Sequence, residues 1–205
     1  MAIVITEKKG SFIDKLKSLG TGSLKKKMIK SMDWFREKVR QAQGSMSPAA
    51  WKLRRSLDDS KRSKSGMTLG MMYFYTYNPK YTEKLPYYDR YPLIFPYKYV
   101  SKPNPGWWGI NLHYLFLNDR ALLMDVLMRF ATDDRLQINE GTIKQMIKSQ
   151  PRIIPCTKRY LNSQVIGKGF IEIEKEEWDS AFLLPVQQFK KASDKEVWKQ
   201  SKAWY

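Results

Sequence analysis

The chain has 205 residues and a formal net charge of +17, with 42% hydrophobic and 28% charged residues. This length fits one domain with an appendage or two small domains, and the composition can bury a hydrophobic core. A single cysteine excludes an intramolecular disulfide. One cysteine and one histidine are too few ligands for a usual zinc site, so we expect no metal and no cofactor. The apolar runs are too short to span a bilayer, and the opening MAIVITEKKG lacks the order of a secretory signal.

The positive charge is concentrated near the start of the chain. Residues 1–66 contain 17 Lys and Arg against 6 Asp and Glu, whereas residues 67–205 contain 20 against 14. A basic arm on a more balanced body is typical of polyanion binding, because Lys and Arg contacts to phosphates dominate such affinity. The alternative is a solvated tail that only keeps the protein soluble. No lipidation motif accompanies the arm, which favours a nucleic acid over a membrane as its partner.

Within the arm, the stretch SLKKKMIKSMDWFREKVRQ (23–41) has apolar residues every three to four positions, which predicts an amphipathic helix. The apolar stripe, expected in the core or an interface, consists of Leu24, Met28, Met32, Phe35 and Val39. Ser47 and Pro48 predict a second helix over 48–59, and the polar stretch 58–66 predicts a linker. The candidate phosphate-binding residues are the cations of these two helices: Lys25, Lys26, Lys27, Lys30, Arg36, Arg40, Arg54 and Arg55.

The composition changes abruptly after the linker. Residues 72–114 contain 14 of the 28 aromatic residues and 10 of the 12 tyrosines. The alternating MMYFYTYNPK predicts a strand that ends in a turn at Asn78-Pro79. Three prolines in LPYYDRYPLIFP (85–96) rule out a regular helix and predict a rigid extended segment, in which any strand lies at an edge of the sheet. Such aromatic side chains can stack on bases or simply form the core of a small β unit, and spacing does not separate the two.

The rest of the chain mixes helices and short strands. We predict strands over 107–117 and 152–160, helices over 118–131 and 139–150, a hairpin around 167–169, and a terminal helix that opens at a capping box, Ser193 to Glu196. The predicted fold class is α+β: a basic N-terminal helical arm, a small mostly antiparallel sheet with the aromatic and proline-rich segment, and packed helices including a C-terminal one. The predicted units are the arm and linker, 1–66, and a compact domain, 67–205.

No constellation of residues indicates catalysis. Metal-dependent phosphodiester hydrolysis needs two or three converging carboxylates. The best candidates are Glu172 and Glu174, which would have to meet Asp125 or Asp89 around a metal. We expect His113 to be a satisfied core histidine in a strand, and a lone cysteine, Cys156, to be structural. Because no nucleophile is found together with a general base, we predict a protein that is not an enzyme. A divergent nuclease is the weakest alternative.

Four blocks carry a resemblance to a known family: MDWFREKVRQ, YFYTYNPKYTEKLPYYDRYPLIFPY, GWWGINLHYLFLNDRALLMDVL and AFLLPVQQFKKASDKEVWKQS. They are similar to small proteins of T-even-like tailed bacteriophages, and the family resembles the DNA end-protector proteins. The resemblance covers roughly residues 31–201, and LPYYDRYPLIFP and GINLHYL are its most specific parts. It implies a virion protein that sits on the ends of the linear double-stranded genome, shields them from host exonuclease, and acts in the host cytoplasm after ejection and during assembly.

A DNA end differs from the interior of a duplex by an exposed terminal base pair. We therefore hypothesise that an aromatic wall stacks on this pair while the basic arm holds the flanking phosphates. The candidate stacking residues are Tyr87, Tyr88, Tyr91, Trp107 and Trp108. The competing hypothesis is a structural protein of the neck, tail or baseplate, whose arm docks on other virion subunits.

Overall fold

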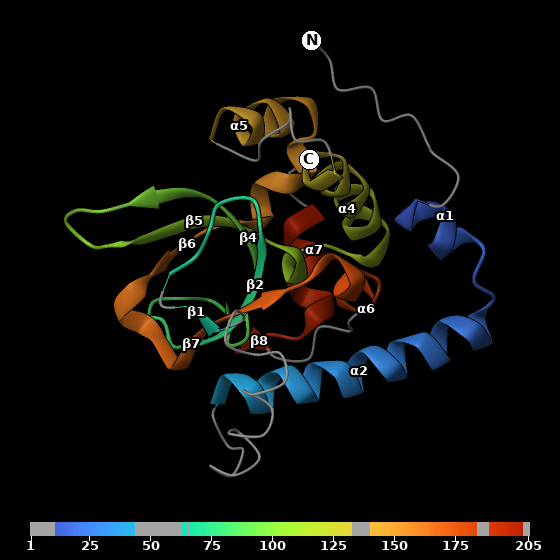
Figure 1. Ribbon diagram of the computed structural model, residues 1–205, viewed down its shortest axis with the longest axis horizontal. Coiled ribbons are helices and arrows are strands. Elements are labelled where there is room, and N and C mark those ends of the chain that lie inside the picture. Colours follow the sequence, from blue (N-terminus) through green and yellow to red (C-terminus); the bar gives the residue numbers. More distant parts are fainter. Residues whose placement is uncertain (1–10, 44–62, 65, 133–139, 184–188, 203–205) are drawn as a thin grey trace.

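The computed structural model describes residues 11–43, 63–64, 66–132, 140–183 and 189–202, and it confirms the predicted α+β class (Figure 1). In this part of the chain, the main sheet is antiparallel throughout and has the strand order β1-β7-β2-β4-β5-β6. Its strands are β1 (Ser63–Lys64), β2 (Met72–Tyr77), β4 (Leu93–Val100), β5 (Gly106–Asn111), β6 (Thr157–Leu161) and β7 (Val165–Ile173). A second, two-stranded sheet pairs β3 (Tyr88–Asp89) with β8 (Phe189–Lys190).

Side-chain alternation along the strands divides the buried residues between two faces of the sheet. In β2, Met72 and Phe74 join the main core cluster, whereas Tyr73, Tyr75 and Tyr77 join a separate cluster. Among the described residues, the buried hydrophobic side chains of the α-helices all belong to the main cluster. The sheet thus has a helix-covered face and, opposite it, an aromatic face, which we define by Tyr73, Tyr75, Tyr77, Trp107, Tyr160 and Phe170.

The α-helices surround the helix-covered face (Figure 1). They are α1 (Phe12–Lys17), α2 (Thr21–Gln43), α4 (Leu117–Thr132), α5 (Glu140–Ser149), α6 (Trp178–Phe182) and α7 (Asp194–Lys202). Short 3-10 turns lie between a strand and a helix or between two strands: η2 (Leu112–Tyr114), η3 (Pro151–Cys156), η4 (Asn162–Gln164) and η5 (Lys175–Glu177).

The described part of the basic arm packs on the body. Phe12 and Ile13 of α1 are buried in the main core, and their backbone N–H groups donate to the carboxylate of Asp125 in α4, at 2.6 Å and 3.2 Å. A carboxylate at this end of α1 satisfies donors that the helix leaves open. α2 lies along β7, β2 and α6 (Figure 1). The division of the chain at residue 66 stays a prediction.

Several sequence expectations are confirmed. The long basic helix is α2, the helices expected over 118–131 and 139–150 are α4 and α5, and the terminal helix is α7. The capping box forms as predicted, because Ser193 N donates to Glu196 Oε2 at 2.7 Å and Glu196 N donates to Ser193 Oγ at 3.3 Å. The helix predicted over 48–59 and most of the linker lie outside the described residues.

The expectation that a strand in 85–96 would lie at an edge is wrong. β4 contains Pro96 yet lies inside the sheet, between β2 and β5. Its pairing with β2 covers Leu93 and Ile94 only, and its register with β5 shifts just after Pro96. The missing N–H of this proline therefore falls where the neighbouring ladder has already ended, which a central strand tolerates.

Three further elements differ from the sequence prediction. The strand expected over 107–117 ends at Asn111, whose side chain accepts from His113 N at 2.9 Å and caps η2. The strand over 152–160 begins only at Thr157, because the prolines before it favour a 3-10 turn. The hairpin at 167–169 is absent: β7 runs on as one strand, its register against β2 shifts there, and Gly169 has a φ of 93°.

Candidate nucleic-acid interface

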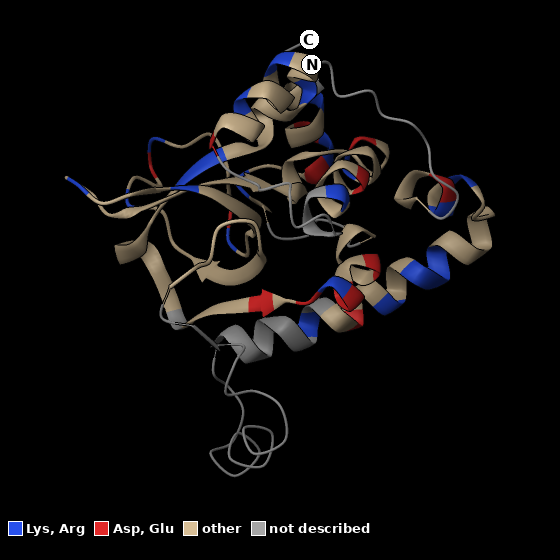
Figure 2. Ribbon diagram, turned by 45° about the horizontal axis from the view of Figure 1, so that its top comes forward, with Lys and Arg blue, Asp and Glu red and all other residues tan. Residues whose placement is uncertain are grey.

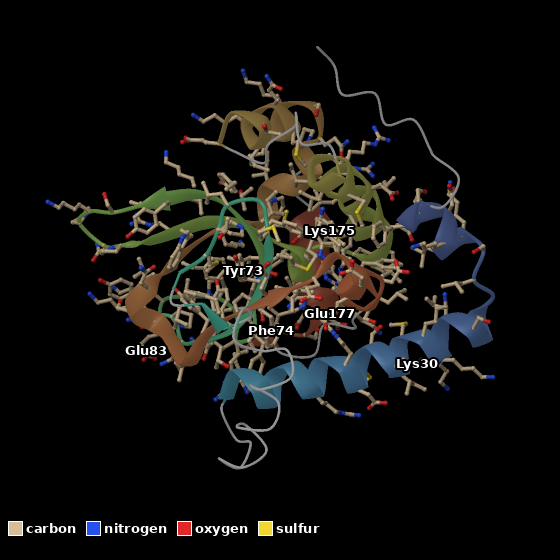
Figure 3. The ribbon with its side chains drawn as sticks, in the orientation of Figure 1. Lys30, Tyr73, Phe74, Glu83, Lys175 and Glu177 are labelled. Carbon is tan, nitrogen blue, oxygen red and sulfur yellow. The ribbon has the colours of Figure 1, made fainter. Side chains whose placement is uncertain are left out.

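α2 carries a set of exposed cations, which we call the basic face: Lys25, Lys26, Lys27, Lys30 and Arg36. They are the predicted cations of this helix whose side chains the structure describes, and they are spread around it rather than confined to one side, because successive residues turn by about 100°. Ser31 and Trp34 hold the helix to the body, because Ser31 is only 2% exposed and Trp34 Nε1 donates to Glu177 Oε1 at 3.2 Å. Figure 2 shows the blue segments along α2, and Figure 3 shows Lys30 on this helix and Glu177 on the segment beside it.

The predicted apolar stripe does not include the most buried of the described side chains of α2. Leu24, Met28 and Met32 are half-buried, while the side chains of Phe35 and Val39 lie outside the described residues. Among the described side chains of α2, the most buried is that of Ser31, whose hydroxyl donates to the Lys27 carbonyl at 3.0 Å. A serine lets a helix lie closer to a neighbouring element than a long side chain does, which the periodicity of apolar residues does not reveal.

Most charges on the basic face are available to a ligand. Arg36 pairs with Asp33 at 2.8 Å, an exposed contact that contributes little. By contrast, none of the four lysines has an ion pair with another described residue. Lys27 and Lys30 also border a hollow of about 150 Å³ against α1 and α6. The side chain of Arg40, and all of Arg54 and Arg55, lie outside the described residues.

The five predicted stacking residues do not form one wall. Tyr91 and Trp107 are 6% and 5% exposed, and they pack on Phe74 and Phe170 at ring-centroid distances of 6.1 Å and 5.0 Å. Trp108 is half-buried and packs against the main core on the helix-covered face. Tyr91 and Trp107 thus belong to the protein interior, and Trp108 packs at its edge. Only Tyr87 and Tyr88 lie together at a hollow.

This hollow is a pocket of about 490 Å³ beside the aromatic face. Its walls come from the end of β2 and the turn after it, the 85–89 segment, η2 and β6. We call it the tyrosine pocket and define it by Lys80, Tyr81, Tyr87, Tyr88, Tyr114, Lys158, Arg159 and Tyr160.

The pocket combines aromatic rings with cations. The ammonium group of Lys158 lies 4.2 Å from the centroid of the Tyr114 ring, and burial lowers the pKa of this lysine. Lys80 lies 5.3 Å from the centroid of the Tyr81 ring at the pocket mouth. Arg159 is fixed by a 2.8 Å hydrogen bond from Nη2 to the Asn104 carbonyl.

A buried polar network fixes one side of the pocket. Asp89 accepts from Tyr91 N at 2.9 Å and from Asn111 Nδ2 at 2.8 Å, and it lies 2.8 Å from His113 Nδ1. Asn111 Nδ2 also donates to the hydroxyl of Tyr160 at 2.9 Å. The network joins the proline-rich segment to β5, β6 and η2, so the pocket wall is rigid.

His113 is buried, as expected, but it lies in η2 rather than in a strand. Its Nδ1 faces Asp89, while its Nε2 has no hydrogen-bond partner among the described residues. The histidine is therefore only partly satisfied. Cys156 is also buried: its thiol donates to the Ile153 carbonyl at 2.8 Å, and burial raises the pKa of the thiol.

The carboxylates that a nuclease would need lie in separate places. Glu172 accepts from the Tyr73 hydroxyl at 3.4 Å, and Glu174 caps η5. Asp125 caps α1, while Asp89 belongs to the buried network. In the described residues, no group of three or more His, Cys, Asp or Glu could hold a metal ion. No helix in this part of the chain is long and apolar enough to span a membrane.

Sequence reasoning missed six of the eight residues that define the tyrosine pocket, all except Tyr87 and Tyr88. Lys80 and Tyr81 stand in the turn after Asn78-Pro79, and Lys158 and Arg159 stand in a strand that is far away in the sequence. The available signal was the alternation of Lys158 with Tyr160, which places a cation and a ring on one face of a strand.

An α+β protein with a basic helix face, whose four lysines have no ion pair among the described residues, and with a cation-rimmed aromatic pocket has the features of a nucleic-acid-binding protein. Comparison with known families gives the particular kind. The family model of the phage T4 terminal DNA protecting protein matches residues 3–205, so the chain belongs to this family, and the resemblance seen in the sequence is confirmed. No curated protein and no solved structure matches the chain.

Proposed function

We propose that this protein binds the ends of a linear double-stranded phage genome and shields them from exonucleases, without catalysis of its own. It acts as a virion component and, after ejection of the DNA, in the host cytoplasm. The observation that carries the proposal is the basic face of α2, four lysines without an ion pair among the described residues, in a chain of this family.

The basic face suits a duplex backbone because its charges are exposed and mounted on a helix that the body holds rigidly. Contacts between lysines and phosphates release condensed counterions, so they supply affinity without sequence preference. A protein that protects any genome end needs this kind of affinity. Occupation of the terminal base pairs by such a protein would then deny an exonuclease its starting point.

A binding titration at several salt concentrations tests the proposal. A linear duplex and a covalently closed circle of the same sequence are compared for the wild type and for a variant with Lys25, Lys26, Lys27 and Lys30 changed to Gln. We expect the wild type to prefer the linear form and to slow its digestion by a double-strand exonuclease. In the variant, the negative slope of log K against log salt should become shallower by up to about 3–4, since each phosphate contact contributes roughly 0.9 to its magnitude.

The matched control removes the same charge elsewhere, on α5 and α7, with Lys144, Lys148, Lys195 and Lys199 changed to Gln. We expect it to keep the preference for ends. Equal binding of linear and circular DNA by the wild type would refute the proposal. If the α2 variant still binds DNA as the wild type does but no longer enters phage particles, the basic face serves a virion subunit, and the assembly hypothesis replaces end protection.

A further inference from the structure

We propose that the tyrosine pocket takes one unpaired nucleotide from the end of a DNA strand, with its base against the tyrosine rings and its phosphate at the lysines. This inference rests on the proposed function and specifies how an end is told from the interior of a duplex. A terminal base pair loses stacking on only one side when it opens, whereas an internal pair loses it on both, so a pocket for one splayed nucleotide favours an end.

The size and walls of the pocket fit such a guest. Its volume of about 490 Å³ lies within the range of roughly 300–1,000 Å³ that holds small organic ligands. Tyr81 is 57% exposed at the mouth, and Tyr87 is half-buried against Tyr114, with 6.1 Å between the ring centroids. Every base has a π face, so tyrosine rings accept any of the four bases.

The charges of the pocket favour a phosphate. Lys80, Lys158 and Arg159 line it, and among the described residues no carboxylate forms an ion pair with either lysine. The only acidic residue that lines it, among those described, is Asp89, whose oxygens already face Tyr91 N, Asn111 Nδ2 and His113 Nδ1. Burial already lowers the pKa of Lys158, so an anion beside it would restore the stability of its charged form.

The pocket is also prepared before a ligand arrives. The buried network of Asp89 fixes Tyr160 and the 85–91 segment, and the backbone N–H of Leu161 donates to the Tyr77 hydroxyl at 3.1 Å. Lys191 donates to the Leu85 carbonyl at 3.3 Å and holds the other side of the segment. Because the wall is preorganised, little conformational entropy is lost when a ligand binds. This favours binding of a nucleotide that has frayed from its base pair.

The test uses the full chain and a DNA hairpin with a single open end. The last base pair is either matched or mismatched, with 2-aminopurine as the terminal base, and the same hairpin closed at both ends is the reference. The variants are Tyr81→Ala, Lys158→Gln and Lys80→Gln. Their controls are Tyr99→Ala, a tyrosine 51% exposed on β4 outside the pocket, and Lys199→Gln, an exposed lysine on α7.

We expect the wild type to bind the mismatched end most tightly, with a change in 2-aminopurine fluorescence. Tyr81→Ala should weaken this binding by roughly tenfold, as removal of one stacking ring does elsewhere, and leave binding of the closed hairpin unchanged. The lysine variants should act in the same direction, and the controls should match the wild type. Circular dichroism checks that each variant is folded. We expect Tyr81→Ala and Lys80→Gln to fold, because both side chains are exposed.

The two proposals fail in different ways. If the wild type prefers open ends and folded pocket variants keep that preference, the pocket inference is overturned while end binding stands. If the wild type binds open and closed hairpins equally, end binding itself fails, and the pocket inference fails with it.

Discussion

At the scale of single residues, two neighbouring tyrosines of β2 differ in what their hydroxyl groups bond. Tyr75 is fully buried, and its hydroxyl has no hydrogen-bond partner among the described residues. The Tyr77 hydroxyl accepts from Leu161 N at 3.1 Å. A buried polar group without a partner costs free energy, whereas loss of a partner leaves a backbone donor open.

We therefore predict that removal of the hydroxyl oxygen has opposite effects on stability at Tyr75 and at Tyr77. Tyr75→Phe should raise the free energy of unfolding by about 1 kcal/mol, and Tyr77→Phe should lower it by about 1 kcal/mol. Urea denaturation followed by circular dichroism measures both. A loss of stability in Tyr75→Phe as large as in Tyr77→Phe would mean that the Tyr75 hydroxyl has a partner, such as a buried water.

At the scale of elements, the pairing of β5 with β6 depends on one glycine. A Cβ atom on Gly106 would lie 1.9 Å from the Tyr160 carbonyl oxygen, which is backbone and cannot move aside alone. Gly106→Ala should therefore push β6 away from β5 and lower the free energy of unfolding by about 2 kcal/mol or more. Because β6 carries Lys158 and Arg159, binding to the open hairpin should weaken as well.

Gly22 supplies the control for this change, since a Cβ there meets nothing within 4 Å. Gly22→Ala lies in α2 and should keep or slightly raise stability, because alanine favours a helix. Chemical denaturation and the hairpin titration measure the two effects separately. A Gly106→Ala protein as stable as the wild type would show that β6 can shift at no cost in stability, and unchanged hairpin binding would show that the pocket is kept.

At the scale of the whole molecule, local signals were readable in the sequence and long-range ones were not. The helices α2 and α7 were predicted because period and capping act within a few residues. The position of Pro96 in a central strand depends on where β2 stops, and the path of β7 through 167–169 depends on the residues it faces. For the same reason the basic face was predicted, whereas the tyrosine pocket, which joins the turn after β2 to β6, was not.

The aromatic composition also sets how the whole molecule responds to alkaline pH. Burial, the largest cause in each case, raises the pKa of Tyr75, Tyr114 and Tyr160 well above the ordinary value of 10, and that of Tyr97 to about 12. These phenols stay neutral in the folded protein but ionise near pH 10 in the unfolded chain. Their contribution to stability is thus complete below pH 10 and is lost as the pH rises from there towards 12 and beyond.

We predict that the free energy of unfolding falls above pH 10 by about 1.4 kcal/mol per pH unit for each such tyrosine, since the unfolded state alone releases the proton. Urea denaturation between neutral pH and pH 12 measures the decline, and Tyr97→Phe should make it shallower. Tyrosinate absorbance from the buried rings should appear together with the loss of structure in circular dichroism. If that absorbance instead rises in full while the fold remains native, solvent reaches the aromatic face, and its tyrosines are not the closed layer that positions the pocket.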